Sequence, residues 1–106
     1  MKIAIIDLSG EQKWSVQGRL VGDWAAELMS TWGKTHHAGD ARRTIVDLIE
    51  VTSIDRNGEA VLAEMMSQGA EFISGDVYIE HLLRKLRREL KRSRMMRKED
   101  VGGTQR

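Results

Sequence analysis

The chain has 106 residues, of which 41% are hydrophobic and 31% charged, and its formal net charge at pH 7 is +1. This length fits one domain with one hydrophobic core and leaves no room for a second. The absence of cysteine excludes disulfide bonds, thiolate metal sites and cysteine nucleophiles. Asp7 interrupts the first apolar run, which is too short for a signal peptide or a membrane span, so we expect a cytoplasmic protein.

Charge is distributed unevenly along the chain. Residues 1–83 carry seven Lys and Arg against thirteen Asp and Glu, a net charge of −6. Residues 84–106 carry ten against three, a net charge of +7. The sequence therefore predicts an acidic body followed by a basic C-terminal segment.

The N-terminal residues predict a β-hairpin. Residues 3–8 are apolar and β-branched, and Trp14 and Val16 alternate with polar neighbours. The turn signal Ser9-Gly10 separates the two stretches, so we expect them to pair.

An amphipathic helix is predicted next. Trp24, Leu28 and Trp32 recur at steps of four, which places one apolar stripe on a helix that packs against the sheet. Asp23 is the candidate N-cap of this helix. We expect all three tryptophans, Trp14 included, to lie in the core. The alternative for Trp24, at the start of the helix, is a contact surface.

The rest of the chain alternates strands and helices, so the sequence predicts the α/β class, a mixed β-sheet with helices packed against it. The last helix completes a domain that spans residues 1–90. Beyond it the apolar spacing fails, and we expect a basic, partly disordered C-terminal tail. The predicted elements are a strand at 44–48, a helix at 59–69, a strand at 71–74, the last helix at 77–90 and the tail at 91–106.

Two segments resemble the STAS domain of anti-sigma factor antagonists. One is Val16-Gln17-Gly18-Arg19-Leu20. The other runs from Ile45 to Gly58 and contains Asp47-Leu48, Val51 and Ile54-Asp55, then an Asp-x-x-Gly turn before the next helix. The resemblance covers residues 13–86 and also matches the order of helix and strand between the two segments. It implies a small STAS-like fold that binds protein partners and has no enzymatic activity.

The resemblance also implies a phosphorylatable Ser or Thr immediately before Gly58, on a loop that meets a kinase-like anti-sigma factor. Asn57 occupies this position. It has no hydroxyl to accept a phosphoryl group, and it lacks the charge of about −1.5 to −2 that phosphoserine carries. We therefore expect no switch at Asn57, which resembles the unphosphorylated, binding-competent state. Ser53 and Thr52 are alternative acceptors, although strand alternation would bury one of them.

The candidate partner-binding site is this turn. We expect Asp55 to cap the following helix, Asn57 to face the partner and Gly58 to let the partner come close. Arg56 and Glu59 lie beside them in sequence. The same residue types also fit a capped turn that contacts no partner.

No pattern in the sequence supports catalysis. There is no Walker-type phosphate loop and no His-Glu-x-x-His motif, and the serines lack a convincing base. His36-His37 with Asp40 is expected to be a solvated loop, because a metal site needs three or four converging ligands. We expect neither enzyme activity nor a cofactor or metal.

The basic segment has three interpretations. The first is a solvated helix face. The second is an electrostatic contact with an acidic partner or with a second copy of the chain. The third is a binding surface for nucleic acid or anionic lipid. Nucleic acid is not the expected partner, because no aromatic side chains are interleaved for stacking on single strands. The residues are Arg84, Lys85, Arg87, Arg88, Lys91, Arg92 and Arg94.

Together these features predict a non-catalytic protein-binding regulatory module that resembles an anti-sigma factor antagonist. The expected partner is a protein of the kinase-like anti-sigma factor class, and a homo-oligomer is a further alternative. The alternative functions are a cytosolic adaptor or subunit of a membrane lipid-transport complex, with the basic tail near the membrane surface, and a small-ligand sensor.

Overall fold

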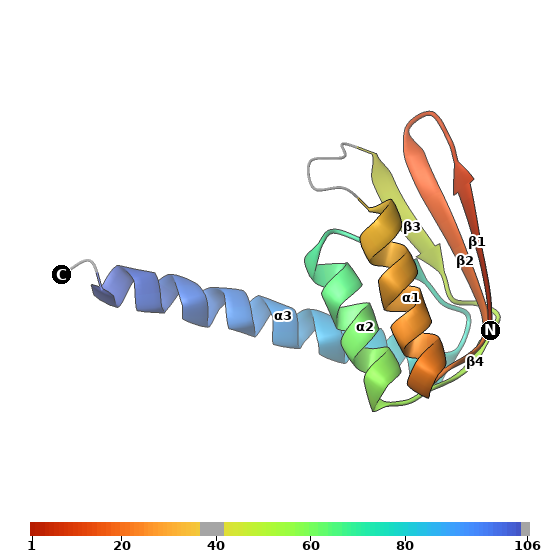
Figure 1. The fold of residues 1–106 in the computed structure, drawn as a ribbon. Coiled ribbons are helices and arrows are strands. Elements are labelled where there is room, and N and C mark those ends of the chain that lie inside the picture. Colours follow the sequence, from red (N-terminus) through yellow and green to blue (C-terminus); the bar gives the residue numbers. More distant parts are fainter. Residues whose placement is uncertain (37–41, 105–106) are drawn as a thin grey trace.

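A mixed five-stranded sheet and three helices make up the fold, which confirms the predicted α/β class (Figure 1). The structure, a computed structural model, describes residues 1–36 and 42–104, with side chains through Ser93. The strands are β1 (Lys2–Asp7), β2 (Glu11–Leu20), β3 (Arg43–Asp47), β4 (Val51–Ile54) and β5 (Glu71–Ile73), and the helices are α1 (Gly22–Thr35), α2 (Arg56–Ser67) and α3 (Val77–Thr104).

The long strand β2 organises the sheet. It forms the predicted antiparallel hairpin with β1 and pairs in parallel with β3, which in turn pairs in parallel with β5. The other end of β2 pairs in parallel with β4, after a register shift between Gly18 and Arg19. The sequence does not predict β4 as a separate strand, because it is only four residues long and follows β3 closely.

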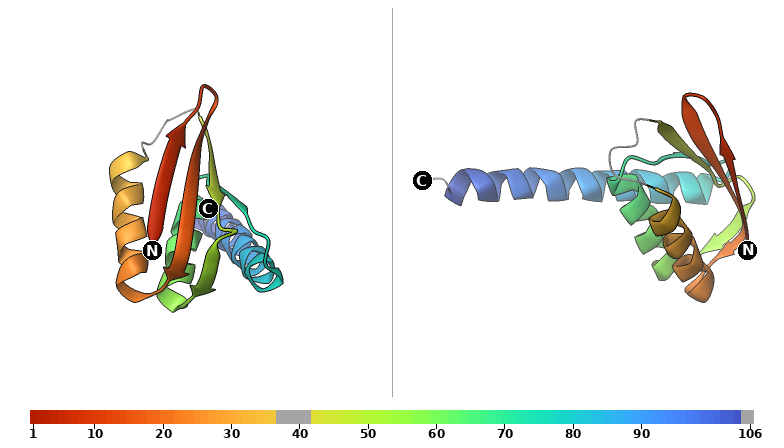
Figure 2. Two further views of the ribbon diagram at one scale, coloured as in Figure 1. Left: turned by 90° about the vertical axis from the view of Figure 1, so that its right-hand side faces the viewer. Right: turned by 45° about the horizontal axis from the view of Figure 1, so that its top comes forward.

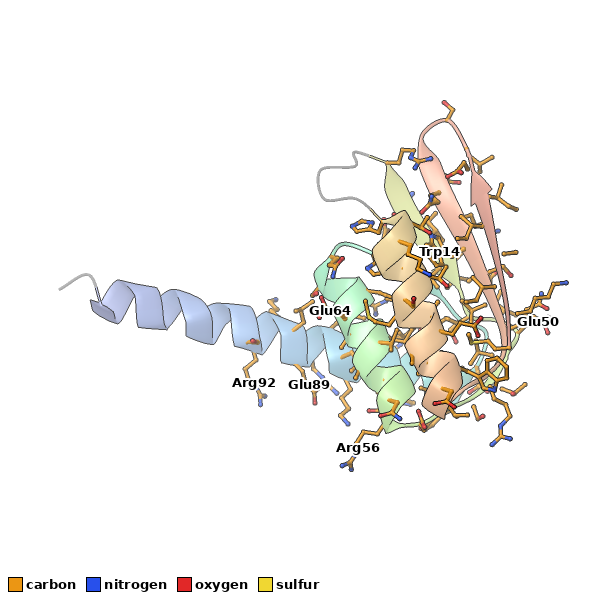
Figure 3. The ribbon with its side chains drawn as sticks, in the orientation of Figure 1. Trp14, Glu50, Arg56, Glu64, Glu89 and Arg92 are labelled. Carbon is orange, nitrogen blue, oxygen red and sulfur yellow. The ribbon has the colours of Figure 1, made fainter. Side chains whose placement is uncertain are left out.

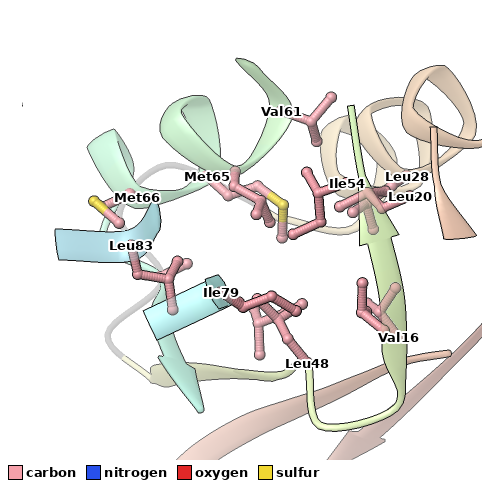
Figure 4. Packing of buried hydrophobic residues seen from close by; sticks show 14 of the residues in the cluster. Val16, Leu20, Leu28, Leu48, Ile54, Val61, Met65, Met66, Ile79 and Leu83 are labelled. Atoms are coloured by element: carbon pink, nitrogen blue, oxygen red, sulfur yellow. The ribbon is translucent and has the colours of Figure 1, made fainter. Parts of the chain in front are cut away.

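The hydrophobic core lies between the sheet and the helices. Alternation along β2 turns Trp14 and Val16 toward α1 and α2, which lie side by side on one face of the sheet (Figures 1 and 2). The rings of Trp14 and Trp32 pack with centroids 5.4 Å apart. Figure 4 shows side chains from all three helices and from the strands meeting in this core.

The start of α1 differs from the prediction at two residues. Val21 is the N-cap and makes no side-chain cap bond, while Asp23 lies within the first turn. Trp24 is 46% exposed, whereas Leu28 and Trp32 are buried. Four residues exceed one helical turn, so steps of four drift around the helix by about 40° each, and Trp24 falls outside the buried stripe.

Asp47, the last residue of β3, stabilises the turn that follows this strand. Its Oδ1 accepts a hydrogen bond from the backbone N–H of Ile49 at 2.9 Å. An aspartate that bonds the backbone two residues on stabilises a turn. Asp47 therefore ends β3 and directs the chain into β4.

The last helix is longer than predicted. Ile79, Leu82, Leu83 and Leu86 are buried against the rest of the protein. Past Leu90, where the sequence placed the end of the helix and the start of a partly disordered tail, α3 continues to Thr104 and projects from the body (Figures 1 and 2). Lys, Arg, Met and Glu, which favour helices, dominate this extension, and it contains no proline.

Within the part of the chain that the structure describes, none of the helices has the length and apolar character that crossing a bilayer requires.

Candidate functional site

The carboxylate of Asp55 joins the beginnings of two helices. Its Oδ1 accepts a hydrogen bond from the N–H of Gly58 in α2, and its Oδ2 accepts one from the N–H of Gly22 in α1, both at 2.9 Å. The N–H of Asp55 also donates to the carbonyl of Leu20, at 3.3 Å. The prediction that Asp55 caps α2 is confirmed. The second bond, to α1, fixes the two helix starts next to each other.

These bonds favour the ionised form of Asp55. Hydrogen bonds from the N–H of Gly58 and then of Gly22 hold the pKa of the Asp55 carboxyl below its ordinary value. The partial positive charge at the start of each helix favours the same charged form. The ionised form of Asp55 is therefore stabilised by backbone N–H groups of both helices.

Gly58 faces the interior. The residue is buried, and a Cβ at this position would lie 2.3 Å from the carbonyl oxygen of Leu20 and 2.8 Å from Cγ2 of Ile54. The prediction that Gly58 lets a partner come close is therefore wrong. The close approach that glycine permits is between α2 and the end of β2.

Four side chains in the first turns of α1 and α2 face solvent. Arg56 and Asn57 are exposed in the first turn of α2, and Figure 3 shows Arg56 pointing outward. Asp23 and Trp24 are exposed in the first turn of α1. Because Asp55 holds the two first turns together, we treat these four residues as a single helix-start surface. Glu59, the last residue of the predicted site, is half-buried.

This surface has the composition of a protein contact. Trp24 offers a large apolar ring with an N–H group, and aromatic residues of this kind dominate the energy of many interfaces. Polar and charged groups surround it. A shallow hollow lies beside Trp24, lined by Val21, Gly22, Asp23, Trp24 and Glu27.

The two hydroxyls upstream of the turn have different environments. Thr52 is exposed, whereas the Oγ of Ser53 is buried and has no hydrogen-bond partner. One of the pair is therefore buried, as strand alternation predicts. A kinase would reach Ser53 only after β4 opened locally.

Of the histidine group, only His36 lies in the part of the chain that the structure describes. His36 ends α1, and its ring stacks on Trp32 with centroids 4.3 Å apart. His37 and Asp40 lie outside the described residues. Among those that are described, no three His, Asp or Glu side chains are placed to hold a metal ion.

The basic residues belong to α3, whereas the helix-start surface belongs to α1 and α2. Figure 3 shows Arg92 far along α3, whereas Arg56 lies at the start of α2. The side chain of Arg94 lies outside the described part of the chain. The described members of the set are all exposed: Arg84, Lys85, Arg87, Arg88, Lys91 and Arg92.

Comparison with known proteins supports the fold alone. No family model and no curated protein matches the chain. Among solved structures, the chain is similar to one described as "Crystal Structure Analysis of Mglu", with a TM-score of 0.55 and 18% sequence identity. The similarity covers 69% of this chain and 19% of that one, so the chain matches about a fifth of the longer protein.

Proposed function

We propose that the chain is a non-catalytic protein-binding module that docks on its partner through the helix-start surface. The observation that carries this proposal is the pair of hydrogen bonds by which Asp55 holds the first turns of α1 and α2 together. These bonds hold Trp24 and Asn57 on neighbouring turns of rigid elements. A contact surface that is already ordered loses less conformational entropy on binding.

Trp24 is the expected anchor. Its exposed ring contributes apolar area, while Asn57 and Arg56 supply polar contacts around it. Interfaces of this kind concentrate their energy in one or two aromatic or arginine side chains. Asp55 and Gly58 act indirectly, since their interactions are within the protein.

The proposed class of module is an anti-sigma factor antagonist, on the resemblance of residues 16–20 and 45–58. In such a module the partner is a kinase-like regulator. Asn57 has no hydroxyl and cannot be switched by phosphorylation, so the chain stays in the binding-competent state. Regulation would then act on the partner or on the amount of this chain.

Affinity purification from the native cytosol tests the proposal. We expect wild-type chain to recover a kinase-like protein, and Trp24→Ala to recover much less of it. Ile6→Ala is the matched control, because Ile6 is 54% exposed and lies on β1, where it pairs with Lys13 near the hairpin turn, away from the end of β2 that leads into α1. Equal recovery with Trp24→Ala and Ile6→Ala would place the contact elsewhere.

The proposed class has a separate test. We expect Asn57→Ser to become phosphorylated when it is mixed with the recovered partner and ATP, while the wild type does not. Mass spectrometry locates the phosphate. Phosphate on Thr52 or Ser53 of the wild type would show that this chain is switched after all.

A further inference from the structure

Six cationic side chains lie close together on one short stretch of α3 and have no anionic partner among the side chains that the structure describes. They lie within nine residues and are all exposed. None forms an ion pair or hydrogen bond with a described side chain, whereas Arg42 and Arg43 of the body pair with Asp7 and Glu71. The six, called the α3 cationic face below, are Arg84, Lys85, Arg87, Arg88, Lys91 and Arg92.

The cationic face covers about half of the helix circumference, since successive residues are about 100° apart around the axis. The other half is the apolar stripe. Leu82, Leu83 and Leu86 in this stripe are buried against the rest of the protein, and Leu90 is half-buried. Glu89 is the one carboxylate between Arg84 and Arg92, and it lies at the border of the stripe. The cations therefore face solvent together, with the exposed Glu89 at the edge of their surface.

We propose that the α3 cationic face binds the phosphate backbone of duplex DNA without reading its sequence. The width of the face favours this partner. The major groove of DNA is about 12 Å wide and admits a whole helix, so phosphates lie on both sides of it. Arg, which contributes four of the six cations, forms bidentate bonds with phosphate.

A bilayer fits this face less well. A helix that lies in a membrane surface inserts an apolar stripe below the headgroups. On α3 the leucines of that stripe are buried in the protein. A flat layer of headgroups would also reach only part of a face that covers half of the helix.

A second copy of the chain also fits less well, although its body is acidic. Three of the thirteen carboxylates of that body are already engaged. Asp7 and Glu71 form ion pairs with arginines, and Asp55 accepts two backbone N–H groups. Single-stranded nucleic acid is disfavoured because the face contains no aromatic side chain on which bases would stack.

Binding of this kind has a measurable signature. Each phosphate that a cation neutralises releases a counterion, so log K falls with log salt concentration by about 0.9 per contact. Removing two contacts should reduce this slope by about 2. Base sequence should not change the affinity.

Fluorescence anisotropy with a labelled duplex of about two helical turns tests the proposal, using the full chain at about 50 and 200 mM salt. We expect the double variant Arg88→Gln with Arg92→Gln to bind about 10- to 100-fold more weakly at the lower salt. The control is Lys2→Gln with Lys34→Gln, which removes the same charge from exposed positions on β1 and α1. We expect this control to bind as the wild type does. Glutamine favours helix, and circular dichroism checks that both variants fold.

Three results would overturn the proposal. Equal loss in the two double variants would mean that net charge alone drives binding. Binding to vesicles of phosphatidylserine and phosphatidylcholine, with none to duplex, would assign the face to a membrane surface. Sedimentation showing a salt-sensitive dimer, abolished in the α3 variant and unaffected by DNA, would assign it to a second copy.

Discussion

The backbone N–H of Gly22 donates a hydrogen bond to Oδ2 of Asp55 at 2.9 Å, across 33 positions of the sequence. The other oxygen of the same carboxylate caps α2 through Gly58. One side chain thus fixes the relative position of the two helix starts. The proposed contact surface depends on this arrangement, because Trp24 comes from one helix and Asn57 from the other.

Replacing Asp55 should loosen both helix starts. We expect Asp55→Ala to lower the Tm by about 4–8 °C, because the N–H groups of Gly22 and Gly58 lose their acceptor. Asp55→Asn should have a smaller effect, since an amide oxygen can still accept one of the two bonds. Thermal unfolding followed by circular dichroism measures both. Asp23→Ala is the control. This residue also lies in a first helical turn but is not a cap, so an equal loss there would contradict the assigned role of Asp55.

The stability of the fold should depend on pH through the same carboxyl. Its pKa is lower in the folded protein than in the unfolded chain, where it is about 3.9. Below that pH the unfolded chain binds the proton more readily, so stability that is present above about pH 4 is lost as the pH falls. The pKa of Glu71, lowered by its hydrogen bond with Arg43, acts in the same direction.

We therefore expect the Tm of the wild type to fall more steeply from about pH 5 to about pH 3 than the Tm of Asp55→Asn. Glu71 is unchanged in Asp55→Asn, so the Tm of this variant should still fall with pH, but less steeply than that of the wild type. Melting curves at a series of pH values provide the comparison. Parallel curves would show that folding does not lower the pKa of the Asp55 carboxyl.

Gly58 should not tolerate even a methyl group. Its Cβ would overlap the carbonyl of Leu20, and backbone atoms cannot move aside as a side-chain end can. We expect Gly58→Ala to destabilise the fold by about 3 kcal/mol in chemical unfolding. Gly33→Ala is the matched control in a helix, because a Cβ there meets nothing within 4 Å. It should stabilise the protein by about 0.5–1 kcal/mol. A mild effect at Gly58 would mean that α2 can shift away from β2.

Local patterns in the sequence predicted the fold class, both strands of the hairpin and the cap of α2 by Asp55. Hydrophobic periodicity and turn chemistry act over a few residues. The fold class, the hairpin strands and the cap of α2 can be predicted from such local patterns alone. The bond from Asp55 to Gly22 depends on how α1 and α2 pack. No local pattern encodes it.

The errors have the same origin. The sequence indicated that something approaches Gly58 closely, but only the packed structure shows that Leu20 is what approaches it. Steps of four placed Trp24 on the stripe with Trp32. A helical turn has only 3.6 residues, so each step of four rotates the side chain further around the axis, and Trp24 leaves the stripe. The end of α3 was set where the apolar spacing stops. The residues after the last apolar contact still favour helix, so α3 extends beyond its buried part.

The affinity of the recovered partner for wild-type chain and for Trp24→Ala, measured by isothermal titration calorimetry, tests the proposed contact surface most directly. Trp24 is 46% exposed, so part of its ring packs against the protein and its loss should lower stability, and unfolding curves verify that the variant remains folded at the temperature of the titration. We expect Trp24→Ala to bind at least about 10-fold more weakly. Ile6→Ala should bind within about twofold of the wild type. Unchanged affinity in a folded Trp24→Ala protein would contradict docking through the starts of α1 and α2.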